Sequence, residues 1–241
     1  MSGHVLVLLE ALPYSMDPRV RAQVAALRDA DFEVTVACPT GGRPEAGQLG
    51  HEGLRVRCFK APRPGRSGAG YVREYGLALA RLARVVRTVA RERPVDLVLV
   101  CTPPDLLVAL TRPLARRGAA VIVDYREISP ELFEVKFGRR GIAHRALLRA
   151  ERYALGHADA VTTVSQSCAE LAIGRGGVDP SRLFLVGNGP DPARVHRVRP
   201  AGGPDAARRR HAGRPRRRIG PVAEPVDERV DLLGGRHPGR Q

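Results

Sequence analysis

The chain has 241 residues, 43% of them hydrophobic, and a formal net charge of +15 at pH 7. This length allows one large domain, or one domain of about 150–200 residues with an additional segment. The basic residues are nearly all Arg, a bias that a GC-rich coding sequence can produce. The total charge therefore does not indicate specific nucleic-acid binding, which needs a clustered basic patch.

Apolar runs and cysteines bear on compartment and metal binding. The first apolar run, Val5–Leu9, ends at Glu10 and is too short for a signal peptide. No segment approaches the roughly 20 apolar residues of a membrane span. The four cysteines are far apart, without a Cys-x-x-Cys motif, so neither a zinc site nor a disulfide framework is predicted. We expect a cytoplasmic protein without a metal or other cofactor.

Apolar runs typical of strands alternate with amphipathic segments typical of helices up to about Val186. The predicted strands are 4–9, 33–38, 54–59, 96–101, 119–124, 160–164 and 183–186. The predicted helices are 17–30, 71–93, 105–117, 130–137, 142–157 and 166–173, and residues 60–70 are predicted to form a mobile loop. Strands separated by helices imply parallel pairing, because parallel neighbours need a crossover connection. We predict an α/β fold with a Rossmann-like parallel sheet flanked by helices, and a ligand site beyond the carboxyl ends of its strands.

The composition changes after about residue 190. Residues 191–241 are rich in Arg, Pro and Gly and contain no aromatic residue. Such a segment cannot bury enough apolar surface to offset its chain entropy, so we predict that it is disordered. Its arginines could bind nucleic acid nonspecifically through phosphates, and no specific nucleic-acid partner is expected.

The loop after the first predicted strand leads into a capped helix. Asp17 is suited to cap this helix, with Pro18 at the first helical position. Arg19 and Arg21 follow near the helix start, where they could meet an anionic group. An ordinary capped helix with solvated arginines fits the same segment, and the residues alone do not decide between the two.

The loop after the fifth predicted strand places several charges together. Asp124, Arg126, Glu127 and Glu131 follow a buried strand within a few residues. A carboxylate near an arginine and low-dielectric protein could act as a general base for a hydroxyl nucleophile. The alternative is that Asp124 and Glu131 are caps and Arg126 is their partner.

Several short motifs, taken in their order along the chain, resemble the N-terminal domain of family 4 glycosyltransferases, which are retaining GT-B enzymes. The matching segments are DPRV at 17–20, ADFEVTV at 30–36, DLV at 96–98, VDYRE at 123–127 with PE at 130–131, ADAVTTVS at 158–165 and VGNGPD at 186–191. The resemblance covers about residues 3–191. Each segment is short, and the specificity comes from their order and spacing. Asp31 stands where the family usually has Gly, in a turn that can require a positive φ.

The resemblance implies sugar transfer from a nucleotide-sugar to an acceptor hydroxyl, in a cleft between two Rossmann-like domains. This domain is expected to hold the acceptor, a saccharide or a lipid-linked sugar. The implied catalytic residues are Glu127 and Asp124, and the implied substrate-binding residues are Arg19, Arg126, Ser165 and Asn188. The family usually has His-Asp or Arg-Asp where this chain has Arg126-Glu127, so the acid is one methylene longer.

The expected domains are 3–190, an acceptor-side glycosyltransferase domain, and 191–241, the disordered tail. The family's second domain, with its two glutamates eight positions apart, is not found in the sequence. A frameshift near residues 190–200 would explain a truncated enzyme that is inactive by itself. The alternative is a non-catalytic remnant or interaction module that binds a saccharide or nucleotide.

Two predicted helices, 71–93 and 142–157, are basic and amphipathic. Such helices can lie on an anionic membrane surface, which would make the protein peripheral at the inner face of the membrane. The alternative is that their apolar stripes pack on the sheet and their arginines are solvated.

Overall fold

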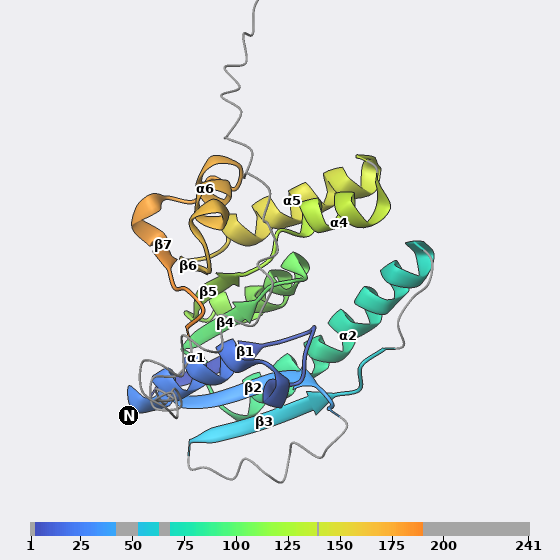
Figure 1. Ribbon diagram of the computed structural model, residues 1–241. Helices are drawn as coiled ribbons and strands as arrows, with labels where there is room; N and C mark the ends of the chain where they lie inside the picture. Colours follow the sequence, from blue (N-terminus) through green and yellow to red (C-terminus); the bar gives the residue numbers. More distant parts are fainter. Residues whose placement is uncertain (1–2, 42–52, 63–67, 139, 190–241) are drawn as a thin grey trace, which may run out of the picture. The chain divides into compact units, whose positions relative to one another are not determined.

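A computed structural model describes residues 3–41, 53–62, 68–138 and 140–189. These residues form a seven-stranded sheet with the order β3-β2-β1-β4-β5-β6-β7, and every neighbouring pair is parallel (Figure 1). The strands are β1 (His4–Leu8), β2 (Glu33–Pro39), β3 (Leu54–Phe59), β4 (Leu97–Cys101), β5 (Ala120–Tyr125), β6 (Ala160–Thr163) and β7 (Leu183–Leu185). The predicted fold class, a Rossmann-like parallel sheet flanked by helices, is confirmed.

Helices lie between successive strands, except between β2 and β3, where residues 42–52 are outside the described part of the chain. The α-helices are α1 (Pro18–Asp29), α2 (Gly68–Glu92), α3 (Arg112–Ala115), α4 (Ser129–Phe137), α5 (Ile142–Gly156) and α6 (Gln166–Gly174). The 3-10 helices are η1 (Tyr14–Met16), η3 (Asp105–Thr111) and η4 (Pro180–Arg182). Helix α1 packs on one face of the sheet, and α2, η3, α5 and α6 pack on the other.

Strand β1 lies at the centre of the sheet and is buried on both faces. Val5 and Val7 pack in the core on the α1 face, whereas Leu6 and Leu8 pack in the core on the α2 face. Such two-sided burial explains why this strand is a continuous apolar run instead of an alternating one. The connection after β1 covers one face and the connection after β4 covers the other, so the winding direction reverses between these two neighbours. Ligand sites of open α/β sheets lie at such a reversal, beyond the carboxyl ends of the strands.

Two local predictions are wrong. The predicted helix 105–117 is instead η3 followed by α3, because Pro113 has no amide hydrogen for a helix running through it and fits only in the first turn of a new helix. Helix α2 begins at Gly68, inside the predicted loop 60–70. Residues 63–67 of that loop and the tail 191–241 lie outside the described residues.

Two further expectations are resolved by the fold. Asp31 has φ of 61°, which matches the positive φ expected at the family's usual glycine. The apolar stripe of α2, formed by Ala78, Leu82, Val86 and Val89, is buried against the sheet, so its apolar face packs internally. Within the described part of the chain, no helix combines the length and apolarity needed to cross a membrane.

Candidate functional site

A buried carboxylate at the carboxyl end of β5 is the centre of the candidate site. The Asp124 side chain is fully buried. Arg19 binds it in a forked pair: Arg19 Nη2 lies 2.6 Å from Asp124 Oδ1, and Nε lies 2.9 Å from Oδ2. The Thr162 hydroxyl of β6 donates a third hydrogen bond to Oδ1 at 2.7 Å. Hydrogen bonds of this kind satisfy the buried charge, which would otherwise be costly.

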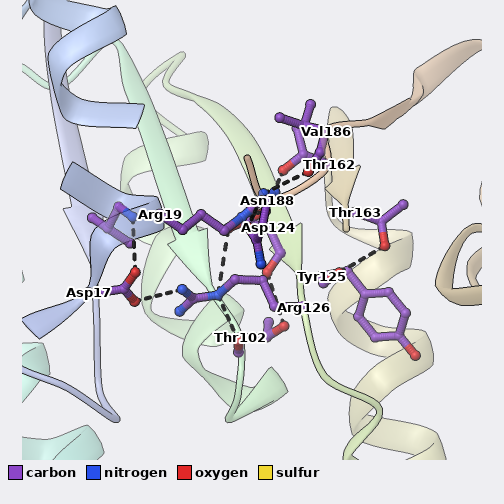
Figure 2. Close-up of polar contacts among 11 residues, drawn as sticks. Asp17, Arg19, Thr102, Asp124, Tyr125, Arg126, Thr162, Thr163, Val186 and Asn188 are labelled. Carbon is purple, nitrogen blue, oxygen red and sulfur yellow. Dashed lines mark hydrogen bonds and ion pairs between the residues drawn. The ribbon is translucent and has the colours of Figure 1, made fainter. Parts of the chain in front are cut away.

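Arg19 also reaches the loop that follows β7. Its Nη1 donates to the carbonyl oxygen of Val186 at 2.7 Å and to Asn188 Oδ1 at 3.0 Å (Figure 2). Pro18 starts α1 and Asp17 caps it by accepting from the amide of Val20 at 3.0 Å, which places Arg19 in the first helical turn. A single side chain therefore ties the start of α1 to the ends of β5 and β7.

A second arginine lies on the other side of Asp124. Arg126 Nη1 donates to Asp17 Oδ2 at 2.6 Å, and its Nε lies 3.6 Å from Asp124 Oδ2. The Arg126 side chain is 16% exposed. Thr102, just after β4, donates from its amide and hydroxyl to the carbonyl oxygen of Asp124 at 3.2 and 3.1 Å. The end of β4 is thus joined to the same cluster.

Two aspartates and two arginines thus form one neutral cluster at the carboxyl edge, which we call the rim cluster: Asp17, Arg19, Asp124 and Arg126. It fastens the loops that follow β1, β4, β5 and β7. Because each arginine is paired with a carboxylate, the rim cluster adds little net positive charge at this edge. Its clear physical effect is to hold four loops in fixed positions.

The other predicted site residues lie around the rim cluster. Glu127 is exposed and follows Arg126 directly. Asn188 is exposed and accepts from Arg19. Ser165 caps α6 by accepting from the amide of Cys168 at 3.2 Å, on the loop that follows β6. The structure brings Asp124, Arg19, Arg126 and Asn188 into contact and places Glu127 and Ser165 on neighbouring loops; the catalytic and substrate-binding roles stay predictions.

A second ion-paired network lies behind the rim. Glu151 of α5 is fully buried and binds Arg175, whose Nε and Nη2 each lie 2.7 Å from a different Glu151 oxygen. Arg175 also binds Glu131, and the Tyr125 hydroxyl donates to Glu151 at 2.8 Å. Burial, and then the neighbouring Glu151, raise the pKa of Tyr125, so its hydroxyl stays protonated. Glu131 is therefore a partner of Arg175, and Arg126 does not pair with it.

Sequence reasoning missed two acids at the same edge. Asp105, at the start of η3, is 3% exposed, and its carboxylate oxygens have no hydrogen-bond partner among the described residues. Burial raises the pKa of Asp105 to about 6. Glu10, just after β1, has its pKa raised to about 7 by burial and by Glu74. The only sequence signal for Glu10 is its position just after the buried strand β1. The only signal for Asp105 is its position after the short loop that follows the buried strand β4.

Asp105→Asn is expected to stabilise the protein near neutral pH. The folded-state pKa of this acid lies above the ordinary 3.8, so the folded state holds the proton more tightly, and stability falls as pH rises from about 4 to about 6. The loss is on the order of 3 kcal/mol, at about 1.4 kcal/mol for each pKa unit. Urea unfolding at about pH 4 and about pH 7.5 should show a gain for the variant only at the higher pH. A variant less stable than wild type at pH 7.5 would contradict the assigned burial penalty.

Two features complete the description of the site. Among the residues that the structure describes, no group of three or more His, Cys, Asp or Glu side chains is arranged to hold a metal ion. A cavity of about 390 Å³ lies at the opposite, amino-end edge, lined by residues 90–95, Leu114 and Arg117. We place the candidate site at the rim cluster because that edge carries the buried charges and the joined loops.

The family described as "Glycosyl transferase 4-like domain" matches residues 16–189, most of the chain and all of the rim cluster. The chain belongs to this family. Among curated proteins, none matches this glycosyl transferase 4-like chain.

Solved structures show the same fold at low sequence identity. Sucrose-phosphate synthase from Thermosynechococcus elongatus has a TM-score of 0.59 and 14% identity, over 78% of this chain and 49% of that one. The glycotransferase of kitacinnamycin has a TM-score of 0.51 and 16% identity, over 84% of this chain and 56% of that one. A UDP-glucosyltransferase from Polygonum tinctorium has a TM-score of 0.50 and 15% identity, over 83% of this chain and 56% of that one. The glycosyl transferase 4-like chain thus spans about half the length of each of these three structures.

Proposed function

We propose that this domain supplies the acceptor side of a retaining sugar transfer from a nucleotide-sugar to a hydroxyl of a saccharide or lipid-linked acceptor. Family membership supports the reaction class. The observation that carries the site assignment is the rim cluster, which fastens four loops at the edge where parallel sheets bind ligands. Such a preorganised edge is what positioning of an acceptor requires.

The proposed roles follow from exposure. Glu127 is exposed beside the rim cluster and accepts a hydrogen bond from the acceptor hydroxyl that attacks the sugar. Asp124 is buried, so it acts on the acceptor through Arg19 and Arg126 as a positioning residue. Arg126, Asn188 and Ser165 border the acceptor and supply further polar contacts.

The diphosphate leaving group needs stabilisation from elsewhere. Departure of a nucleoside diphosphate builds negative charge that must meet fixed cations or hydrogen-bond donors. Arg19 and Arg126 are already paired with Asp124 and Asp17. We propose that these arginines do not serve the leaving group, and that the polypeptide assayed alone does not complete transfer. Robust turnover of UDP-glucose or GDP-mannose by the purified chain would overturn the second proposal.

Glu127→Gln is expected to weaken saccharide binding by roughly 10- to 100-fold, because a hydrogen bond to a charged group contributes about 1.5–3 kcal/mol. The measurement is saturation-transfer-difference nuclear magnetic resonance (NMR) with methyl glycosides of glucose, galactose, mannose and N-acetylglucosamine. Glu170→Gln, an exposed glutamate on α6, is the matched control and should bind as wild type does. Equal binding by both variants would remove Glu127 from the site.

The non-catalytic alternative makes a separate prediction. A saccharide- or nucleotide-binding module would bind its ligand without turning over a donor under any condition. Addition of a donor-side glycosyltransferase domain in trans distinguishes the two proposals, since the acceptor-side proposal expects transfer to appear then and the binding-module alternative does not.

A further inference from the structure

Two cysteines lie opposite each other on neighbouring strands. Cys38 of β2 and Cys58 of β3 are 20 positions apart in the sequence and are register partners in the parallel pairing of these strands. Both side chains pack in the core on the α1 face of the sheet. Their Sγ atoms are 4.0 Å apart. The register of the sheet therefore creates a thiol pair that the spacing of the cysteines along the chain does not indicate.

The strand spacing at this thiol pair is compatible with a covalent bond between the two sulfurs. Neighbouring strands lie about 4.8 Å apart, and disulfides join residues whose Cα atoms are about 4.4–6.8 Å apart. In a disulfide the sulfurs are about 2.05 Å apart, so the two Sγ atoms must approach by about 2 Å. Rotation of both side chains about χ1 moves the sulfurs over distances of this size while the strands stay paired.

The two thiols differ in their exposure to solvent. Cys38 is fully buried, whereas Cys58 is half-buried on β3, the edge strand of the described sheet (Figure 1). An oxidant can therefore reach Cys58 first, with Cys38 next to it. An accessible thiol beside a second one is typical of redox sensors, in which the second cysteine resolves the oxidised first one. Cys101 and Cys168 are buried in β4 and α6, and burial raises the pKa of Cys101, which keeps that thiol protonated and unreactive.

We propose that Cys38 and Cys58 are a redox-responsive pair that hydrogen peroxide closes into a reversible disulfide. The Cys58 sulfur attacks one peroxide oxygen, the O–O bond breaks and the other oxygen leaves as water, which gives a sulfenic acid. The Cys38 sulfur then attacks the Cys58 sulfur, and the Cys38 proton leaves with the sulfenic hydroxyl as a second water. The two sulfurs thus lose two electrons, which reduce one peroxide to two waters, and a dithiol reductant reverses the change. This inference goes beyond the proposed sugar transfer, so its test needs neither a donor nor an acceptor.

Closure of the disulfide fixes the edge strand to its neighbour. Thr40, just after β2, already donates from its amide and its hydroxyl to the carbonyl oxygen of Phe59 at 2.8 and 3.1 Å, so the two strand ends are held together by hydrogen bonds. The disulfide adds a covalent ring over residues 38–58, which restricts the unfolded chain much more than the folded one. The oxidised form should therefore have an unfolding equilibrium constant roughly 100-fold lower than that of the reduced form.

The direct test is mass spectrometry of the full, reduced chain after a limited dose of hydrogen peroxide, followed by alkylation and peptide mapping. We expect a disulfide between Cys38 and Cys58, while Cys101 and Cys168 are still alkylated once the chain is unfolded. Cys101→Ala with Cys168→Ala retains only the proposed pair and should form the same bond at the wild-type rate. Oxidation of Cys58 to a sulfinic acid without a cross-link, a disulfide between two chains, or no oxidation at all would overturn the proposal.

Single substitutions and stability measurements separate a native disulfide from one formed in the unfolded chain. Cys38→Ser should stop at the sulfenic acid of Cys58, which dimedone traps, and Cys58→Ser should resist the same dose of peroxide. In urea unfolding, peroxide should raise the wild-type midpoint, dithiothreitol should restore it, and Cys38→Ser should show no such rise. A disulfide that lowered the wild-type midpoint would show that the native strands do not hold the bond, and the proposal would be wrong.

Discussion

Asp124→Asn is expected to lower the free energy of unfolding by about 3–5 kcal/mol, because it removes the buried counter-charge of Arg19. The Arg19 side chain is only 8% exposed, so water cannot replace the lost carboxylate. The variant also removes one of the two carboxylates that pair with Arg126, and leaves only that of Asp17. Urea unfolding monitored by circular dichroism measures the change directly.

The matched control is an ion pair of the same kind at the surface. Glu92→Gln breaks the pair with Arg57, in which both side chains are more than a third exposed, and should cost no more than about 1 kcal/mol. A double-mutant cycle adds a second criterion: Arg19→Met should cost much less in the Asp124→Asn background than in wild type. If Asp124→Asn and Glu92→Gln had the same free energy of unfolding, the rim cluster would not be a structural centre.

Glu151→Gln is expected to be the other large loss, again about 3–5 kcal/mol. Glu151 is fully buried and is the shared acceptor for Tyr125 and Arg175. The glutamine side chain can accept a hydrogen bond from Tyr125 or from Arg175. It has no negative charge, so Arg175 keeps only one carboxylate partner, that of the more exposed Glu131. The melting temperature should fall in step with the urea midpoint if the effect is on the fold as a whole.

Glu134→Gln provides the comparison for this network. It breaks the pair with Arg140, whose side chain is 73% exposed, and a change of at most about 1 kcal/mol is expected. A Glu151 variant as stable as the Glu134 variant would show that the α5–α6 network contributes little to stability.

The fold was largely predictable because its signals are local. Continuous apolar runs such as Val5–Leu9 indicate two-sided burial, and the cap Asp17-Pro18 marks the start of α1. Pro113 could have warned that no single helix runs through 105–117. The sequence order of short motifs was enough to identify the family, although each motif alone was weak.

The site was only partly predictable because its contacts are long-range. Arg19 and Asp124 are separated by 105 positions, and nothing near either residue specifies the other as its partner. The sequence places Arg126 near the acids Asp124 and Glu131, and an ion pair with Asp124 does form, but the hydrogen-bonded partner of Arg126 is Asp17, 109 positions away. Asp105 was invisible as a buried, unpaired acid, because burial depends on how η3 packs against the sheet. Roles for Glu127 and Ser165 require a bound acceptor.

The central claim is that the carboxyl edge of this sheet forms one wall of a saccharide site. Its most direct test is amide chemical-shift mapping by NMR on the isotope-labelled chain, titrated with the methyl glycosides named above. The predicted result is a set of shifts gathered on the loops after β1, β4, β5, β6 and β7, with Glu127, Ser165 and Asn188 among them. Shifts confined to the amino-end cavity around Pro94 and Arg117, or no saturable shift with any glycoside, would contradict the account.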